Sequence, residues 1–178
     1  MFSFDPYKEL ATLRDFPPLT LTSPDFSGDA ALPVTAWSSD RGGADRHPAL
    51  EWNTPPEGTR SFALSCFDPD APTGSGYWHW AVFNLPADLR SLDAGDGTIE
   101  SLPGGARVLR NEAGNRRFDG AAPPEGTGVH RYFFVVDALD VAELDVGDDA
   151  TPAILGFHRH FHSLARGVLM GTADPTER

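Results

Sequence analysis

The chain has 178 residues, enough for one domain with a substantial core, and its 40% hydrophobic and 11% aromatic content argues against disorder. The 18 glycines and 16 prolines predict many short elements joined by loops. A formal net charge of −12 opposes attraction to nucleic acid or to an anionic bilayer. We therefore expect no nucleic-acid partner and no integral membrane association.

The first expected element is a helix of one or two turns over residues 7–14, ended by Pro17 and Pro18. Period-two or continuous apolar runs then predict short strands. The run "GVHRYFFVVDALD", rich in aromatic and β-branched residues, is the strongest of them. The apolar character of both faces indicates sheets that are covered on both sides. The strands are expected at 19–26, 49–52, 60–67, 79–86, around 106–111 and at 128–140.

The C-terminal segment changes its period. From Ile154 to Leu169 the apolar residues repeat at helical spacing. Thr151 is a candidate N-cap, Pro152 suits the first helical position and Gly171 is a candidate C-cap. The sequence therefore predicts a mainly β domain over residues 1–178, with its core at about 19–171, short peripheral helices and a C-terminal helix that continues to Gly171.

The cysteine content and the N-terminal residues indicate in which cellular compartment the protein is expected. Cys66 is the single cysteine, so an intrachain disulfide is excluded, and its apolar surroundings predict a small buried core residue. The N-terminal residues show no basic region followed by an apolar one, and no stretch approaches the length of a membrane span. We expect a cytoplasmic protein.

The stretch "FDPDAPTGSGYWHW", residues 67–80, gathers the residue types of a site. Asp68 and Asp70 follow an apolar strand at a forced turn, and His79 opens the next strand. Such residues could serve acid–base chemistry, a metal site, a ligand pocket or a hydrogen-bonded turn. Two carboxylates in one pocket would repel each other. We therefore expect one to bind backbone N–H groups of the turn while the other faces a cavity.

Three segments in order, "DPDAP", "WHWAVFNLP" and "PPEGTGVHRYFF", closely resemble the signature segments of the phosphatidylethanolamine-binding protein (PEBP) family, which includes the Raf kinase inhibitor proteins. The segment "SPDFSG" with the following "LP" and "PALEW" is similar to the N-terminal part of that family. The likeness runs from about Leu19 to Gly171, and "GSGYWHWAVFNLP" places it nearer to the bacterial branch. The resemblance implies a β-sandwich-like core with a small anion-binding pocket at its rim.

The resemblance also implies which residues build that pocket. A Gly-rich approach that lines the pocket of the family reads "FDGAAPP" here, with alanine at 121 and 122 and with Phe118 where bacterial members often carry tyrosine. One hydroxyl donor would then be missing, which affects the expected anion affinity. Asp68 is the expected cavity-facing carboxylate. The implied ligand-binding residues are Asp68, Asp70, Pro72, His79, Gly120, Ala122, His130 and Tyr132.

Strand alternation indicates which way these side chains point. His130 shares a face with Tyr132 and Phe134, and Arg131 points the other way, so it is expected to anchor a loop or a carboxylate. A carboxylate in an anion pocket is reasonable if Asp68 stabilises a protonated histidine that donates to the ligand. It is also reasonable if the ligand is zwitterionic, because an ammonium group needs an anion.

Other reactive patterns are weaker. His158 and His162 share a helical face in "GFHRHFHS", but no third acidic ligand is near, so a polar helix edge is the better interpretation and no metal is expected. Arg107, Arg110 and the pair at 116–117 form a basic cluster, of which one member could line the pocket rim. The sequence contains no nucleophilic serine motif, P-loop or dinucleotide fingerprint, and no cofactor is expected.

Three hypotheses remain open on the sequence. The first is a binding protein for a small anionic or phosphorylated ligand that modulates a protein partner such as a kinase or a protease. The second is an enzyme, an isomerase or cyclase, in which Asp68, His79 and His130 act as acid and base on a less polar substrate. The third is an interaction scaffold whose pocket has no role. Resemblance to bacterial members also suggests a homodimer.

Overall fold

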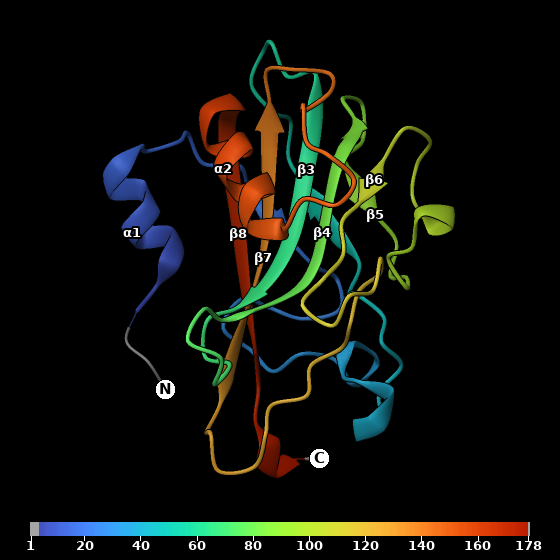
Figure 1. The fold of residues 1–178 in the computed structure, drawn as a ribbon. Coiled ribbons are helices and arrows are strands. Elements are labelled where there is room, and N and C mark those ends of the chain that lie inside the picture. Colours follow the sequence, from blue (N-terminus) through green and yellow to red (C-terminus); the bar gives the residue numbers. More distant parts are fainter. Residues whose placement is uncertain (1–3, 178) are drawn as a thin grey trace.

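The computed structural model describes residues 4–177, which form two antiparallel sheets with the two α-helices on one side (Figure 1). The larger sheet has the strand order β6-β4-β3-β7-β8, and the smaller sheet has the order β1-β2-β5. The strands of the larger sheet are β3 (Ser61–Asp68), β4 (Tyr77–Pro86), β6 (Arg107–Val108), β7 (His130–Leu139) and β8 (Ser163–Ala173). Those of the smaller sheet are β1 (Leu21–Thr22), β2 (Leu50–Trp52) and β5 (Ser91–Leu92).

The helices are α1 (Pro6–Leu13) and α2 (Pro152–His162), with four short 3₁₀ helices, η1 (Val34–Ala36), η2 (Ser39–Arg41), η3 (Ile99–Ser101) and η4 (Pro175–Glu177). Asp5 caps α1 through hydrogen bonds from Tyr7 N and Lys8 N. Thr151 caps α2, and Pro152 occupies its first turn, as the sequence predicts. None of the helices within residues 4–177 is long and apolar enough to cross a membrane.

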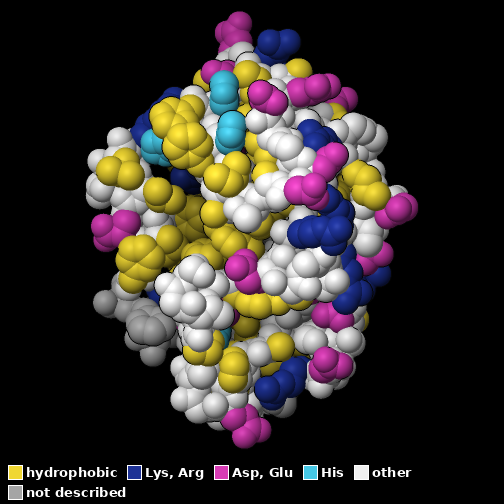
Figure 2. Space-filling model, viewed as in Figure 1, with side chains coloured by type: hydrophobic (Ala, Val, Ile, Leu, Met, Phe, Trp, Pro, Cys, Tyr) yellow, Lys and Arg dark blue, Asp and Glu magenta, His cyan; other side chains and the backbone are white. Residues whose placement is uncertain are grey.

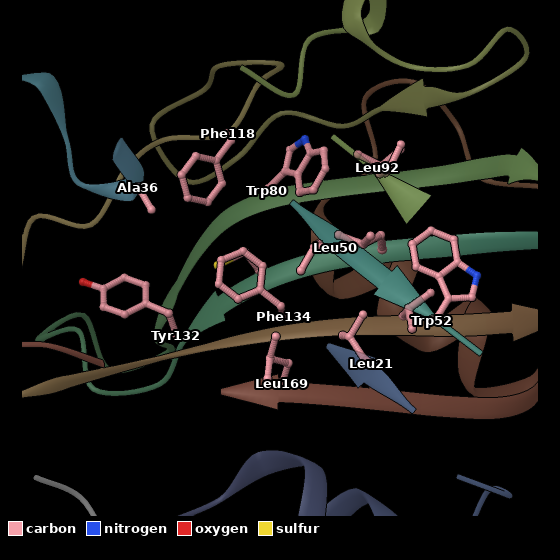
Figure 3. Packing of buried hydrophobic residues seen from close by; sticks show 14 of the residues in the cluster. Leu21, Ala36, Leu50, Trp52, Trp80, Leu92, Phe118, Tyr132, Phe134 and Leu169 are labelled. Carbon is pink, nitrogen blue, oxygen red and sulfur yellow. The ribbon is translucent and has the colours of Figure 1, made fainter. Parts of the chain in front are cut away.

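The large sheet is covered on both faces, which explains its apolar strands. Phe62, Leu64 and Phe134 pack against the small sheet in one cluster, whereas Ala63 and Phe83 pack toward α2 in another. Figure 3 shows the first cluster, in which side chains of the small sheet lie against those of β3, β4 and β7. Every residue of β7 is buried, and the lone cysteine is buried in β3 as predicted. The predicted mainly β architecture with a C-terminal helix is confirmed.

The predicted extent of the C-terminal helix is wrong. The helix ends at His162, and residues Ser163–Ala173 form β8, which pairs with β7 along its whole length. The buried positions of β8 alternate, but they are filled largely by serine, alanine and glycine. Gly167 is required there, since a Cβ would lie 2.6 Å from the backbone oxygen of Leu19, and a Cβ at Gly171 would lie 2.5 Å from Cδ2 of the Leu32 side chain. Because the buried face consists of small residues, the two-residue hydrophobic period of the strand is weak in the sequence. The helical spacing of the larger side chains therefore led to the wrong prediction.

The strand expected at 19–26 is also shorter than predicted, because the N-terminal segment follows the outer edge of β8 instead. Leu19 N donates to Arg166 O at 2.9 Å, and Arg166 N donates to Pro17 O at 3.1 Å. Further along, Leu32 N donates to Thr172 O at 2.8 Å. These contacts cover an edge strand that would otherwise be open to pairing with another chain.

Candidate functional site

A cavity of about 470 Å³ lies where the C-terminal end of β3 meets the N-terminal ends of β4 and β7. Antiparallel pairing brings these ends together: Asp68 is opposite Tyr77, and Phe67 is opposite Phe133. The loop after β3 and the segments 38–45 and 115–124 complete the walls. Among the predicted site residues, the lining includes Asp68, Pro72, His79, Gly120, Ala122, His130 and Tyr132.

Asp68 holds the turn and contacts a histidine at the same time. Its Oδ1 accepts hydrogen bonds from Asp70 N at 2.7 Å and from Ala71 N at 3.1 Å. Its Oδ2 lies 2.7 Å from His130 Nδ1, and both side chains are almost completely buried. Asp68 therefore faces the cavity as expected, and it also accepts hydrogen bonds from the turn, a role that the expected division had assigned to the other aspartate.

His130 has a hydrogen-bond partner at each ring nitrogen. Thr127 Oγ1 donates its single hydrogen to Pro124 O at 2.6 Å, so it meets His130 Nε2, 2.8 Å away, as an acceptor. At the other nitrogen, Nδ1 faces the Asp68 carboxylate, which already accepts two backbone N–H groups. Both nitrogens of His130 are therefore engaged, and the ring is held between Asp68 and Thr127.

His79 is the histidine with an unused nitrogen. Its Nδ1 lies 2.7 Å from Asp119 O, which fixes the tautomer, and Nε2 makes no hydrogen bond within residues 4–177. Burial lowers the pKa of His79, although the bond to Asp119 and the nearby Asp68 charge act in the opposite direction. At neutral pH the ring is therefore uncharged, and Nε2 is available to a ligand.

Tyr132 lies beside this histidine. The ring centres of His79 and Tyr132 are 5.0 Å apart, in an edge-on arrangement. Burial, followed by the charge of Asp68, raises the pKa of Tyr132, so its hydroxyl stays protonated. Figure 3 shows this hydroxyl directed away from the ring of Phe134 and the rest of the core. Tyr132 can therefore supply one neutral hydrogen-bond donor at the cavity wall.

Asp70 does not line the cavity. Its Oδ2 accepts from Arg131 N at 2.9 Å and from Arg131 Nε at 2.7 Å, and its Oδ1 accepts from Arg131 Nη2 at 2.8 Å. The expectation that Arg131 anchors a carboxylate is confirmed. Because these bonds join the loop after β3 to the start of β7, Asp70 positions the loop that carries Asp68 and holds the neighbouring His130 in place.

The approach segment 118–122 differs in part from the expectation. Phe118 is fully buried in the core, 6.2 Å from Phe134 between ring centres, and it does not line the cavity. Gly120 lies against the backbone of residues 37–38, where a Cβ would come within 2.3 Å of the Trp37 carbonyl carbon. The glycine is thus required by chain packing, and Gly120 N donates to Asp45 Oδ1 at 2.9 Å. Ala122 lines the cavity, whereas Ala121 is buried behind it.

Several lining residues were not predicted, and most of them come from the loops around the strand ends. Arg117, one member of the basic cluster, reaches the cavity as the sequence analysis allowed, and its Nε lies 3.2 Å from Asp119 Oδ1. Asp119 also accepts from Asn115 Nδ2 at 3.0 Å. Asp119, which precedes Gly120 in the approach segment, was the one sequence feature that could have pointed to this group of lining residues. The unpredicted polar lining residues are Ser38, Ser39, Asp40, Asp45, Thr73, Tyr77, Asn115 and Asp119.

The histidines of α2 lie outside this site. His162 Nδ1 is 2.8 Å from Asp140 Oδ1, at the exposed end of the helix. Within residues 4–177 no group of three or more His, Cys, Asp or Glu side chains is arranged to hold a metal ion. The chemistry of the site therefore depends on two imidazoles, the phenols of Tyr77 and Tyr132, one guanidinium and the carboxylates around them.

Comparison with known proteins gives the same assignment by independent routes. The family model described as phosphatidylethanolamine-binding protein matches residues 22–174. The UPF0098 protein YbhB of Escherichia coli K12 is 52% identical over 119 residues, which cover 66% of this chain and 75% of YbhB. The crystal structure of E. coli YbcL, described as a new member of the mammalian PEBP family, superposes with a TM-score of 0.83 at 35% identity, covering 88% of this chain and 98% of YbcL.

The structure of CT736 from Chlamydia trachomatis D/UW-3/CX, described as a PEBP homolog, gives a TM-score of 0.75 at 28% identity over 88% of this chain and 97% of CT736. The range matched by the family model, residues 22–174, includes every segment that lines the cavity. The family model, the relatives and the fold thus agree, and the chain belongs to the phosphatidylethanolamine-binding protein family.

Proposed function

We propose that this small ligand-binding protein takes a phosphate-bearing or other anionic head group in the cavity at the end of β3. The observation that carries the proposal is the convergence of His79, His130 and Tyr132 on one wall, next to the buried Asp68. An imidazole paired with a carboxylate, a phenol donor and a second imidazole with an unused nitrogen together offer hydrogen-bonding groups for an oxyanion.

The remaining lining argues for a head group that carries both charges. Four carboxylates line the cavity, and Arg117 is its only guanidinium among the described residues. A simple dianion would therefore meet considerable negative charge. A zwitterion such as phosphoethanolamine would place its phosphate toward the histidines and its ammonium toward the carboxylates on the other walls. The lining carboxylates are those of Asp40, Asp45, Asp68 and Asp119.

A titration followed by NMR tests the proposal, with phosphate, phosphoethanolamine and acetate as probes. We expect saturable shifts in the wild type, tightest with phosphoethanolamine, and their loss in a folded His79→Gln variant. His162→Gln is the matched control, since it removes an imidazole outside the cavity. No saturable shift with any of the three probes would overturn the proposal.

Acid–base catalysis is the second candidate, and the unused Nε2 of His79 favours it. A neutral imidazole beside a phenol donor can accept a proton from a bound substrate, with Asp68 and His130 supporting the site. Product formed from a small, weakly polar substrate by the wild type but not by folded His79→Gln would support an isomerase or cyclase. Turnover that persists in this variant would exclude His79 as the base.

Three further expectations, on the protein partner, the oligomeric state and the location, also remain predictions. A kinase or protease partner, a homodimer and a cytoplasmic location follow from the resemblance and the sequence. Size-exclusion chromatography with light scattering measures the oligomeric state directly, and a monomer at all concentrations would overturn the homodimer.

A further inference from the structure

A second cavity, an apolar groove of about 830 Å³, lies between α1 and α2 on the face of the large sheet that is opposite the small sheet. Figure 2 shows hydrophobic side chains gathered around a hollow on this face, where Figure 1 places the two helices. The volume falls within the roughly 300–1,000 Å³ typical of small-ligand sites. Its apolar lining includes Leu10, Leu13, Phe67, Trp78, Phe157 and Phe161.

The groove walls expose large apolar side chains. Leu13 is 76% exposed, and Phe157 and Phe161 are 61% and 58% exposed. The two phenylalanine rings pack edge to face with their centres 5.0 Å apart, so they form one aromatic wall along α2. A contiguous apolar surface of this kind on a soluble domain indicates a binding surface.

The groove floor carries more positive than negative charge. Arg159 and Arg166 both line the groove, and both approach the single fully buried carboxylate of Asp137. Arg166 Nε donates to Asp137 Oδ1 at 2.7 Å, whereas Arg159 Nη1 lies 3.3 Å from Oδ2 without making a hydrogen bond. Two guanidinium groups therefore share one carboxylate in a desolvated environment.

Arg159 in particular has unused donor capacity. Its side chain is 3% exposed, its Nη1 donates to Ser65 Oγ at 2.9 Å, and its buried Nε has no hydrogen-bond partner within the described residues. Burying a cation without full compensation is costly. Nearby, burial raises the pKa of Tyr7, so the phenol supplies no negative charge. The lining carboxylate, Glu9, lies on the exposed side of α1.

We propose that this groove binds a single-chain amphiphile with an anionic head, of the fatty-acid class. The alkyl chain lies along the wall of Phe157 and Phe161, and the carboxylate approaches the guanidinium groups. An apolar tail matches the aromatic lining, and a negative head supplies the charge that Asp137 alone does not provide. Binding here is independent of the anion pocket, because the two cavities share no lining residue.

The test is a titration with decanoate below its micellar concentration, read from the NMR signal of the Trp78 indole N–H. Decan-1-ol and decylammonium are the neutral and cationic probes of equal chain length. We expect saturable binding of decanoate and binding of the other two that is weaker by about tenfold or more, since a hydrogen bond to a charged group contributes roughly 1.5–3 kcal/mol. Saturating acetate should leave decanoate binding unchanged, which separates this site from the anion pocket.

Two exposed residues of α2 provide matched variants. Phe161 lines the groove, whereas Ile154 is 46% exposed on the same helix and does not line it. Phe161→Ser should weaken decanoate roughly tenfold through lost apolar contact, and Ile154→Ser should change it little. Arg159→Met should bring decanoate and decan-1-ol to similar affinities if the variant folds.

The overturning results are equally specific. Absence of saturable binding to the wild type, or equal binding of decylammonium, would refute an anionic occupant. Equal effects of Phe161→Ser and Ile154→Ser would refute this location. A dimer that dissociates on Phe161→Ser, with no binding of decanoate, would assign the groove to a second copy of the chain instead.

Discussion

Asp70 and Arg131 form a buried pair in which one carboxylate accepts three hydrogen bonds, from the backbone N, Nε and Nη2 of the arginine. The pair joins residues that lie 61 positions apart in the sequence. Its position directly beside Asp68 and His130 means that the geometry of the cavity depends on a contact outside the cavity.

Arg131→Leu should therefore destabilise the protein by about 3–5 kcal/mol, because it leaves a buried carboxylate without its cation. Urea unfolding at neutral pH measures this change. Arg90→Leu is the control, since Arg90 is exposed and its hydrogen bonds go to the nearby carbonyls of residues 87 and 89, and an effect within about 0.5 kcal/mol is expected. Equal stabilities of the two variants would contradict a structural role for the buried pair.

His47 should make stability depend on pH. Burial lowers its pKa to about 4, and its ring is stacked on Trp80 with the centres 4.3 Å apart. Between this value and the ordinary value near 6.5, the unfolded chain binds a proton at His47 and the folded chain does not, so stability falls as the pH is lowered. His79, whose pKa is also lowered by burial, contributes in the same direction.

Between about pH 7.5 and about pH 5, the loss attributable to His47 is about 2 kcal/mol. Urea unfolding of wild type and His47→Phe at both pH values isolates the contribution of His47, because the carboxylates contribute equally to the pH dependence of stability in the two proteins. The variant should lose about 2 kcal/mol less than wild type over this interval. Identical losses would show that His47 titrates normally in the folded protein.

Anion binding should strengthen as the pH falls toward the pKa of His79. The ring is neutral in the free protein at pH 7, and an anion beside Nε2 favours the protonated form, so binding takes up a proton. Affinity should then fall by up to about tenfold per pH unit between the pKa of His79 in the free protein and its pKa in the complex, and level off above the latter. NMR titration with phosphoethanolamine across this range checks it, and His79→Gln should remove the dependence. An affinity that rises with pH would place the ligand elsewhere.

Gly120→Ala tests the packing of the approach segment. A Cβ at this position would lie 2.3 Å from the Trp37 carbonyl carbon, so the backbone must move, at a cost of about 1–3 kcal/mol. The change should also weaken anion binding, because residue 122 lines the cavity. Gly104→Ala is the matched control, since nothing lies within 4 Å of its added Cβ. Thermal unfolding compares the two, and equal midpoints would refute the close contact.

Much of the fold follows from local sequence signals. The caps at Asp5 and Thr151 act within a few residues of the chain. The apolar runs of β3, β4 and β7 indicate buried strands and no other type of element. The motif residues at the ends of these strands also meet, because antiparallel neighbours place successive strand ends at the same edge of a sheet. The resemblance to the family indicated that these motif residues line a pocket. The chemistry of the individual residues had left this open.

Other features required contacts between distant segments. The apolar residues of 163–173 are compatible with the period of a helix and with that of a strand. The segment forms a strand because it pairs with β7. The partner of Asp70, the burial of Phe118 and the loop residues around Asp119 depend on chain crossings that no local pattern encodes.

The sequence by itself determined the β-rich class, the family and the residues at the strand ends, because hydrophobic period, capping and motif spacing are local properties. Only the tertiary structure decided that Asp70 is the partner of Arg131, and that Arg159 and Arg166 share one carboxylate beneath an apolar groove. The reason is physical: charge pairing and cavity shape depend on which side chains are desolvated together, and that is fixed by packing.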